Sequence, residues 1–433
     1  MSPTELHIAA LPFPSYQGTQ AAIRSMLEAR YARRMRAELF TYGARGYAWA
    51  PKFAVHRGPD DVRTALRSGP SWAKVFADVR MARALPALCD QRNARVLIAH
   101  HVEAMGLTSS VRTLPRVFFA HTDLAAELPC YAAPRYARIL EAAGAMADRV
   151  LCMEANAIAA ISPALCEKLR AATGLPVTYV PTPWPVPEPI HSAERRRARH
   201  QLGLAEDTCV ALYAGNLDAY QAAEQTLAAL EQLALSSGPR VTMLLATNSQ
   251  PERFLARAVQ LGVPFRSYAL GDEPIRRLLH AAADLAIVPR ATPGGLPMKL
   301  LDALARGTPC ALAPLAAAGL ALQGVTEQAT APGHKALADS IARLTHRLGH
   351  PEQRRALADR ARAYVANEHR PERFHAALDK VIAQAKRDHR SASGSVRSVN
   401  VHDGSHRSNN IHTPSSAAAP KHVRSHFVRS HDE

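Results

Sequence analysis

Residues 284–314, DLAIVPRATPGGLPMKLLDALARGTPCALAP, decide the fold of this chain. The stretch begins with a short apolar run, DLAIVP, which is typical of a strand buried on both faces. A glycine pair at 294–295 forms a turn, and Pro297 then opens a helix, because proline is favoured in the first helical turn. Gly307 ends this helix, and the apolar run at 309–314 predicts the next strand. A strand, a helix and a second strand in succession indicate a parallel sheet.

The same alternation extends along most of the chain. Apolar runs lie at 6–11, 38–42, 95–100, 116–121 and 149–153, and in the second half at 208–215, 241–247, 264–270, 284–289 and 309–314. This order is typical of α/β folds, in which helices cover both faces of a mostly parallel sheet. Five prolines in PTPWPVPEP (181–189) interrupt the alternation, because proline is excluded from helix interiors and central strands. We therefore expect two α/β halves joined by a proline-rich hinge.

Composition excludes several classes of protein. The chain has 433 residues, enough for about two to four domains. No run approaches the roughly 18 apolar residues that a membrane-spanning helix needs, and the N-terminus lacks the features of a secretory signal. The six cysteines are scattered without a C-x-x-C pair, which disfavours a disulfide framework or a zinc site and fits a reducing cytoplasm. The net charge of +16 favours an anionic partner: nucleic acid, a membrane surface or a phosphate-bearing ligand.

The C-terminal stretch 386–433 differs in character from the rest. It is rich in Ser, His, Arg and Asn and carries eight Lys and Arg against four Asp and Glu, a net charge of +4. Such a stretch buries too little apolar surface to offset its ordering entropy, so we expect disorder. Its seven histidines are compatible with metal binding, but their irregular spacing favours a solvated basic tail.

The turn and helix after residue 289 carry the clearest chemical signal. A glycine-rich turn before a helix N-terminus presents free backbone N–H groups and the positive end of the helix dipole, which together favour an anion. Lys299 lies in the first helical turn, and Asp302 lies three residues on, hence on the same face. A cation at the phosphate position and a carboxylate for ribose hydroxyls would suit a nucleoside diphosphate. An amphipathic helix with a solvated Lys–Asp pair explains the spacing equally well.

A family resemblance decides between these interpretations. The segment resembles the donor site of retaining family 4 glycosyltransferases with the two-domain GT-B architecture, in the subset that reads P-R-x(3)-G-x(2)-P-x-K-x(2)-[EDN] and continues A-x-G-x-P. The matching residues are Pro289, Arg290, Gly294, Pro297, Lys299, Asp302, Gly307 and Pro309. Four other segments resemble parts of the same family: LPFPSYQGTQAAI near the N-terminus, RVFFAHTDLAAELPCY after residue 115, residues 146–183 at the end of the acceptor domain and its linker, and VALYAGNLDAYQAAEQTLAAL after residue 209. The likeness covers about residues 6 to 385.

The resemblance implies an organisation for the whole chain. Residues 1–180 would form an acceptor-binding Rossmann-like domain, 181–193 the hinge, and 194–367 a nucleotide-sugar-binding Rossmann-like domain. Residues 368–385 would form a helix that crosses back to the first domain, and 386–433 the tail. The implied partners are a nucleotide sugar and a saccharide or lipid-linked acceptor, and a nucleic acid partner is not expected.

The resemblance also implies site residues. His121, Arg290 and Lys299 would take part in catalysis. The donor-binding set would be Gly18, Thr19, Gly215, Asn216, Gly294, Gly295, Leu296, Lys299 and Asp302. No metal or other cofactor is implied. The expected activity is transfer of a hexosyl-type group to a hydroxyl acceptor with retention at the anomeric carbon.

The chain departs from the commoner family pattern in three ways. The first of the two glutamates spaced seven residues apart would fall at Gly294 and is missing, and the second is shortened to Asp302. The family's usual Arg and Lys in the donor-domain loop fall at Asn216 and Gln221, which are uncharged. Arg290 and Lys299 are the nearby cations that could replace them. These departures either relocate the phosphate clamp or weaken it, and relocation is favoured because the P-R and P-x-K pieces occur together.

His121 ends a predicted buried strand, which is where ligands bind in parallel α/β sheets. A structural histidine with satisfied hydrogen bonds explains the position almost as well. His100, His101 and Glu103 follow the preceding strand and extend a polar cluster. Neither Glu103 nor Asp123 can be assigned as a general base without geometry.

The helix expected at 21–38 carries five arginines and two glutamates. With Ile23, Met26, Leu27 and Tyr31 toward the core, its arginines would point outward, either into solvent or onto an anionic membrane surface. We expect a cytoplasmic protein. If the arginines contact a membrane, it would be peripheral on the inner face of the cytoplasmic membrane. Lipopolysaccharide or exopolysaccharide biosynthesis is the pathway that the family suggests. The main alternative is a non-catalytic scaffold with a degenerate transferase fold. Nucleic-acid binding through the tail ranks last, because the ordered part of the chain has no recognisable nucleic-acid motif. A sugar-nucleotide epimerase shares the architecture, but the P-x-K-x-x-D-A-L-A-x-G segment argues against it.

Overall fold

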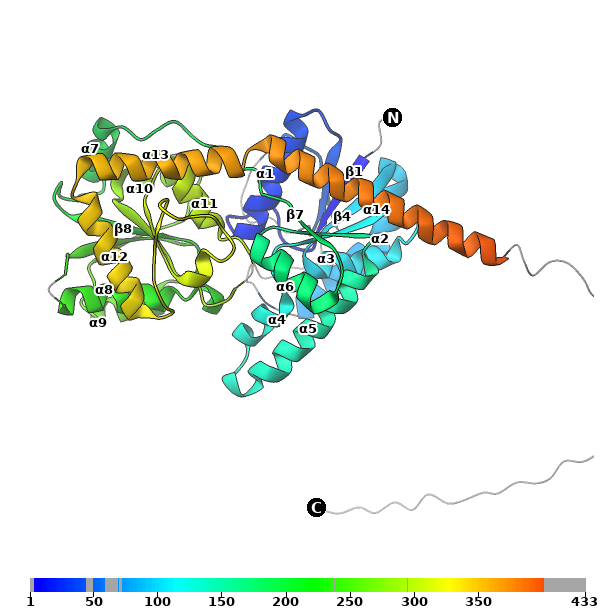
Figure 1. The fold of residues 1–433 in the computed structure, drawn as a ribbon, viewed down its shortest axis with the longest axis horizontal. Coiled ribbons are helices and arrows are strands. Elements are labelled where there is room, and N and C mark those ends of the chain that lie inside the picture. Colours follow the sequence, from blue (N-terminus) through cyan, green and yellow to red (C-terminus); the bar gives the residue numbers. More distant parts are fainter. Residues whose placement is uncertain are drawn as a thin grey trace, which may run out of the picture. The chain divides into compact units, whose positions relative to one another are not determined.

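Two parallel β-sheets covered by helices make up the described part of the chain (Figure 1). The computed structural model describes residues 4–43, 50–58, 69, 72–236, 238–293 and 295–400, the last eight as backbone only. We call the first sheet with its helices the first domain and the second sheet with its helices the second domain. The predicted fold class, two parallel-sheet α/β domains, is confirmed.

In each sheet, the strands follow the order of the sequence outward in two opposite directions from one pair of central strands. The first runs β3 (Val55–Arg57), β2 (Ala37–Thr41), β1 (Thr4–Ala9), β4 (Ala94–His100), β5 (Arg116–Ala120), β6 (Ala157–Ala160) and β7 (Val177–Tyr179). The second runs β10 (Phe265–Tyr268), β9 (Val241–Ala246), β8 (Cys209–Ala214), β11 (Leu285–Val288), β12 (Cys310–Leu312) and β13 (Glu327–Gln328). The chain order reverses between β1 and β4 and between β8 and β11. Open α/β sheets bind ligands at such points, beyond the carboxyl ends of the strands.

Helices connect the strands in both domains. Those of the first are α1 (Gly18–Ala32), α2 (Trp72–Arg92), α3 (His101–Leu107), α4 (Leu124–Glu127), α5 (Ala137–Glu154) and α6 (Pro163–Thr173), with short 3-10 turns η1 (Thr108–Ser110), η2 (Leu128–Tyr131) and η3 (Pro134–Tyr136). Those of the second are α7 (Ser192–Gln201), α8 (Ala223–Leu235), α9 (Glu252–Gln260), α10 (Glu273–Ala282), α11 (Met298–Ala305), α12 (His334–Leu348) and α13 (Pro351–Glu368), with η4 (Ala219–Gln221) and η5 (Pro314–Ala316). α14 (Pro371–Asn400) follows.

Burial explains why these segments form strands and helices. The central strands β1, β4, β5, β8 and β11 consist almost wholly of buried residues, as expected for sheets covered on both faces. The helix after the decisive turn, α11, buries Leu300, Leu301 and Leu304. It begins after Pro297 and is followed by Gly307 at a positive φ of 73°, so both predicted boundary signals operate.

One predicted strand is wrong. Residues 149–153 lie within α5, and the neighbouring segment Ala157–Ala160 forms strand β6 instead. The buried face of α5 holds Gly144, Asp148 and Cys152 at helical spacing, and the Asp148 carboxylate accepts hydrogen bonds from the backbone N–H groups of the α4 start. A five-residue apolar run fits a strand and a buried helix turn equally, so periodicity could not separate them.

The predicted basic helix at 21–38 is also corrected. α1 ends at Ala32, because Arg34 adopts a left-handed φ of 58° and the chain then enters β2. Arg30 does not point outward: its side chain is fully buried and pairs with Glu5 and, at 2.8 Å, with Asp379 of α14. Ile23, Met26 and Leu27 are buried as predicted, whereas Tyr31, which was also expected to face the core, is 50% exposed.

The C-terminal helix is longer than predicted, since α14 continues to Asn400 rather than ending at 385. Up to residue 390 it belongs to the same compact unit as both sheets. The remainder of the predicted tail, 401–433, lies outside the described residues. Residues 180–191, within and around the predicted hinge, form neither helix nor strand. No helix in the described part of the chain combines the length and apolarity needed to cross a bilayer.

Candidate functional site

The candidate site begins where β8 and β11 end, at the reversal point of the second sheet. Gly215 directly follows β8, and Lys299 comes from the first turn of α11. The Lys299 ammonium lies 4.1 Å from the centre of the Tyr213 ring, a cation–π contact. A Cβ at residue 215 would lie 3.0 Å from both Cε and Nζ of Lys299, and the φ of 149° there also favours glycine. Glycine at 215 therefore makes room for the lysine.

The Lys299 ammonium is buried without a hydrogen-bond partner among the described residues. Burial, together with the charge of Arg290, lowers the pKa of Lys299 to about 7. Arg290 is itself buried, and its Nε donates a hydrogen bond to the Thr292 carbonyl at 2.9 Å. Burial also lowers the pKa of Arg290, and the nearby Tyr220 and Glu127 partly oppose that shift. Two buried cations beside a helix N-terminus, one of them unpaired, form a site that favours an anion.

Loops of the first domain approach the same place. Gly18, at the start of α1, faces the Met298 side chain of α11: a Cβ on Gly18 would lie 3.5 Å from the Met298 Cγ. A Cβ on Gly295 would overlap the carbonyl oxygen of His121, well inside the 3.0 Å that real Cβ atoms keep. These contacts bring Gly18, Gly295 and His121 together around the start of α11. Thr19 is half-buried in the first turn of α1.

His121 directly follows β5 and is buried. Its Nε2 lies 2.9 Å from Nδ1 of His100, and Nε2 of His100 lies 2.8 Å from Nδ1 of His7. Burial, with the neighbouring His100 and His101, holds the pKa of His121 well below its usual value, so the ring is neutral. The contact between His100 and His121 confirms the expected polar cluster. His7 was missed, although its place among apolar residues in LHIAAL marks a polar side chain in a buried strand.

A charged pair lies next to this histidine row. His101 adopts a left-handed φ of 77°, and its Nδ1 lies 3.0 Å from a Glu103 carboxylate oxygen. Burial opposes the charge on His101, but Glu103 outweighs it and raises the pKa to about 9. The His101 ring stacks on His121 with centroids 6.5 Å apart. A protonated His101 therefore adds a positive charge beside the neutral His121.

Three predicted residues occupy other environments. Asp302 accepts a hydrogen bond from Arg306 Nε at 3.1 Å and lies 3.5 Å from His280 Nε2, so its carboxylate is paired with these residues and not with Lys299. Asn216 donates from Nδ2 to Asp218 at 2.6 Å and to the Tyr220 hydroxyl at 3.2 Å. Leu296 is a buried core residue. Gly294 lies outside the described residues.

Asp123 has a structural partner. Its carboxylate caps α4 by accepting a hydrogen bond from the Ala126 N–H at 2.9 Å, and Lys168 lies against the same oxygen. Within the described ranges, no group of His, Cys, Asp and Glu side chains is arranged to hold a metal ion.

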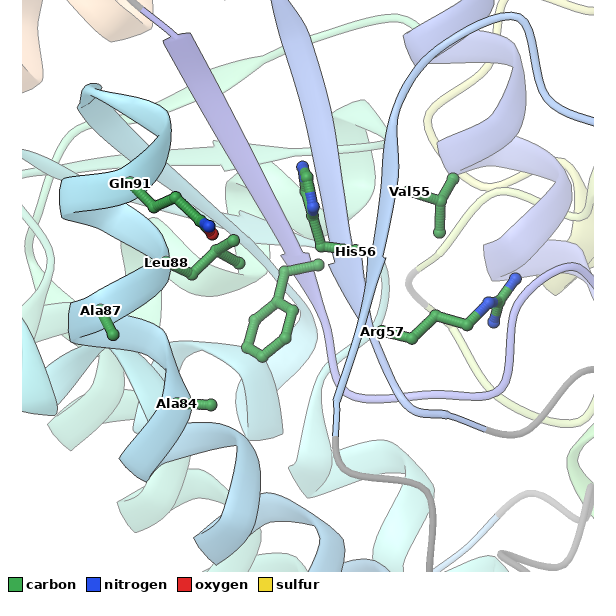
Figure 2. Close-up of a pocket in the computed structure, with 8 residues that line it drawn as sticks. Val55, His56, Arg57, Ala84, Ala87, Leu88 and Gln91 are labelled. Carbon is green, nitrogen blue, oxygen red and sulfur yellow. The ribbon is translucent and has the colours of Figure 1, made fainter.

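A pocket lies elsewhere, at the β3 edge of the first sheet. Its volume is about 710 Å³, and Figure 2 shows Leu88 and Gln91 of α2 pointing toward it. The lining residues are Phe40, Val55, His56, Arg57, Ala84, Ala87, Leu88 and Gln91. None of the predicted site residues is among them. The convergence of predicted residues at the start of α11 therefore defines the candidate site, rather than this pocket.

Comparison with known proteins finds a family model that is similar to part of the second domain. Residues 208–347 match the family described as "Glycosyl transferases group 1". This stretch contains Gly215, Arg290 and Lys299. No curated protein matches the chain by sequence.

Solved structures resemble most of the chain in fold. Sucrose-phosphate synthase from Thermosynechococcus elongatus superposes with a TM-score of 0.73 at 17% identity, covering 88% of this chain and 99% of that one. HepE from Anabaena, solved with UDP and glucose, gives 0.65 at 16% identity, covering 88% and 100%. WaaG, a glycosyltransferase involved in lipopolysaccharide biosynthesis, gives 0.63 at 16% identity, covering 87% and 99%. The chain thus has the two-domain GT-B fold.

Proposed function

We propose that this protein is a retaining, metal-independent glycosyltransferase that moves a sugar from a nucleoside-diphosphate donor to a hydroxyl acceptor. The buried Lys299 ammonium carries the proposal, because it has no partner among the described residues while Arg290 lies close enough to lower its pKa. A buried cation without a partner is costly unless an anion completes the site. The family match over 208–347 and the UDP bound by the similarly folded HepE support a nucleotide diphosphate as that anion.

The proposed mechanism uses charge rather than a covalent intermediate. Lys299 and Arg290 would stabilise the negative charge that grows on the leaving diphosphate, and preorganised stabilisation of this kind is a large catalytic term. Backbone N–H groups after Gly18 and at the start of α11 would add to it. The acceptor hydroxyl would attack from the leaving-group side, and its proton would pass to a phosphate oxygen. Closure of the two domains would exclude water and limit hydrolysis.

The pathway is a further part of the proposal. A saccharide or lipid-linked acceptor in lipopolysaccharide or exopolysaccharide biosynthesis fits the fold shared with WaaG. The reaction would take place in the cytoplasm. Docking on the inner membrane face would have to use surfaces other than Arg30, because that side chain is buried and paired with Glu5 and Asp379.

Incubation of the purified protein with a panel of nucleotide sugars tests the proposal, since slow hydrolysis of one donor would identify it. Lys299→Ala should then lower turnover by about 10²-fold, as the loss of one oxyanion-hole donor does. The exposed Lys335→Ala is the matched control and should leave turnover unchanged. Equal turnover of Lys299→Ala and the wild type would contradict the assigned role. Turnover that survives EDTA would support metal independence.

A non-catalytic scaffold is the second candidate. It is favoured by Asn216, which is uncharged and already bonded to Asp218 and Tyr220. Thermal melting with UDP, GDP and ADP separates the two functions, because any ligand that binds only the folded state raises the melting temperature. No shift at millimolar concentration with any of the three nucleotides would favour the scaffold.

A further inference from the structure

Three buried histidines form a diagonal row across the first sheet. In the parallel pairing, Ala9 of β1 lies opposite His100 of β4, and His100 lies opposite Phe119 of β5. His7 therefore stands two residues before Ala9, the β1 partner of His100, and His121 stands two residues after Phe119, its β5 partner. Since side chains alternate between the two faces of a strand, all three rings lie on one face. The row leads from within the sheet to its carboxyl edge, where the candidate site lies.

Hydrogen bonds link the whole row. The two nitrogen–nitrogen distances are 2.8 Å between His7 and His100 and 2.9 Å between His100 and His121. Each ring is at most 3% exposed. The outer nitrogens, Nε2 of His7 and Nδ1 of His121, are buried and have no partner within the described part of the chain. The row is thus an isolated unit with one end at the candidate site.

The rings stay neutral at physiological pH. Burial lowers the pKa of His7 to about 3, with a contribution from the Arg30 charge, and burial also lowers the pKa of His100 and His121. The other groups next to the row also disfavour a charged ring. Phe119, which contacts His100 and His121, is apolar, and His101, which is paired with Glu103, is itself a cation. A neutral imidazole carries one N–H and one bare nitrogen.

Neutral rings leave only two arrangements for the row. Either every N–H is on Nδ1 and points toward His121, or every N–H is on Nε2 and points toward His7. The first leaves a bare acceptor at Nε2 of His7 and an N–H at Nδ1 of His121, and the second reverses the two ends. A hydroxyl group or water at the candidate site can complete Nδ1 of His121 as acceptor or as donor, so the His7 end, deep in the sheet, decides. A buried donor without a partner is rarer in proteins than an under-satisfied acceptor, which favours the first arrangement.

We propose that His7 and His100 are positioning residues that hold His121 with its hydrogen on Nδ1, so that His121 donates a hydrogen bond to a ligand oxygen at the candidate site. This rests on the proposed function, in which the oxygen is a hydroxyl or ring oxygen of the transferred sugar. With its hydrogen on Nδ1 and no bare nitrogen toward the ligand, His121 is a donor and not a general base. The row therefore favours nucleotide sugars whose sugar offers an oxygen acceptor next to Nδ1 of His121.

Nuclear magnetic resonance of the full chain labelled with ¹⁵N-histidine tests the row without any ligand, because protonated and bare ring nitrogens have well-separated shifts. We expect His121 to carry its hydrogen on Nδ1 between pH 6.5 and pH 8. A hydrogen on Nε2, or a charged ring in the row at pH 7, would overturn the proposal.

Two variants of equal bulk at His7 test whether the far end sets the tautomer. His7→Met offers only a weak acceptor to His100 and should shift the His121 hydrogen toward Nε2. His7→Gln can still donate to His100 and should keep it on Nδ1. Phe119→Leu loosens the packing around two of the rings without breaking the row, and it should also keep the hydrogen on Nδ1. An unchanged tautomer in His7→Met would refute transmission along the row.

Comparing kcat/KM for the nucleotide sugar with the Kd for the bare nucleotide separates a positioning role from a general packing effect. In His7→Met, kcat/KM for the nucleotide sugar should fall by about two- to tenfold, the worth of one neutral hydrogen bond. The Kd for the bare nucleotide should change by no more than about twofold, since the row does not contact the phosphates. Equal losses for both ligands would point to a general packing defect and overturn the positioning role. If the wild type binds no nucleotide sugar, the proposed function fails, while the tautomer measurement still decides the row.

Discussion

Raising the pH from 7 to 9 should weaken nucleotide binding steeply, because Lys299 loses its proton in the free protein. Burial and the neighbouring Arg290 hold the pKa of Lys299 at about 7. A bound diphosphate favours the charged ammonium and should return the pKa toward the ordinary lysine value of about 10.4. Binding therefore takes up a proton. Affinity is full below pH 7 and is lost as the pH rises past the pKa of the free protein.

The size of the loss follows from these two pKa values. About half of the free protein carries the charged lysine at pH 7, and about 1% does at pH 9. The Kd should therefore rise about 50-fold between these pH values, or about 2.3 kcal/mol of binding free energy. The diphosphate itself changes little over this range, since the last phosphate ionisation lies near pH 6. Proton uptake should be about 0.5 per nucleotide at pH 7 and close to about 1 at pH 8.5.

Isothermal titration of UDP in buffers with different ionisation enthalpies measures both quantities. Lys299→Arg keeps its charge at all these pH values and should bind with a Kd that does not depend on pH. Lys299→Met has no charge and should bind weakly, with an equally flat profile. A wild-type Kd that stays constant from pH 7 to pH 9, or binding without proton uptake, would refute the reasoning.

Three further changes have expected outcomes. Gly295→Ala places a methyl group against the His121 carbonyl and should lower kcat by about 10²-fold through misplacement of the loop; Gly106→Ala, whose Cβ would meet nothing within 4 Å, is the control in the same steady-state assay. Asp284→Asn replaces with a neutral amide the carboxylate that pairs with Arg195, Arg199 and Arg354. Because Arg199 is buried, the free energy of unfolding should fall by about 3–5 kcal/mol in denaturant titrations. Glu103→Gln removes the charge that keeps the pKa of His101 high, so the His101 resonance should titrate well below pH 9; a titration still centred near about 9 would contradict the pairing.

Local sequence signals located much of the second domain and its site. The Pro297 and Gly307 signals define α11, and Lys299 lies in its first turn, against Gly215. Asp302 shows the limit of such signals. Its partners Arg306 and His280 come from the end of α11 and from α10, and spacing within one helix cannot reveal a partner on another helix.

The histidine row could not be predicted for a related reason. Alternating apolar runs predict that strands exist, but they do not state which strands become neighbours. β1 pairs with β4 although β2 and β3 lie between them in sequence, and only this pairing brings His7 to His100. The run at 149–153 failed differently, since a few apolar residues fit a buried helix turn as well as a strand.

The ion pairs of α14 determine how the chain can be divided. Arg30 of the first domain pairs with Asp379, and Arg33 reaches the same carboxylate at 3.0 Å. A gene fragment that stops at residue 180 would leave the wholly buried Arg30 guanidinium without one of its two counter-charges and would uncover the surface on which Leu378 and Val381 pack. A soluble first domain for binding studies should therefore be expressed together with residues 371–390, supplied as a second polypeptide or spliced through a short linker.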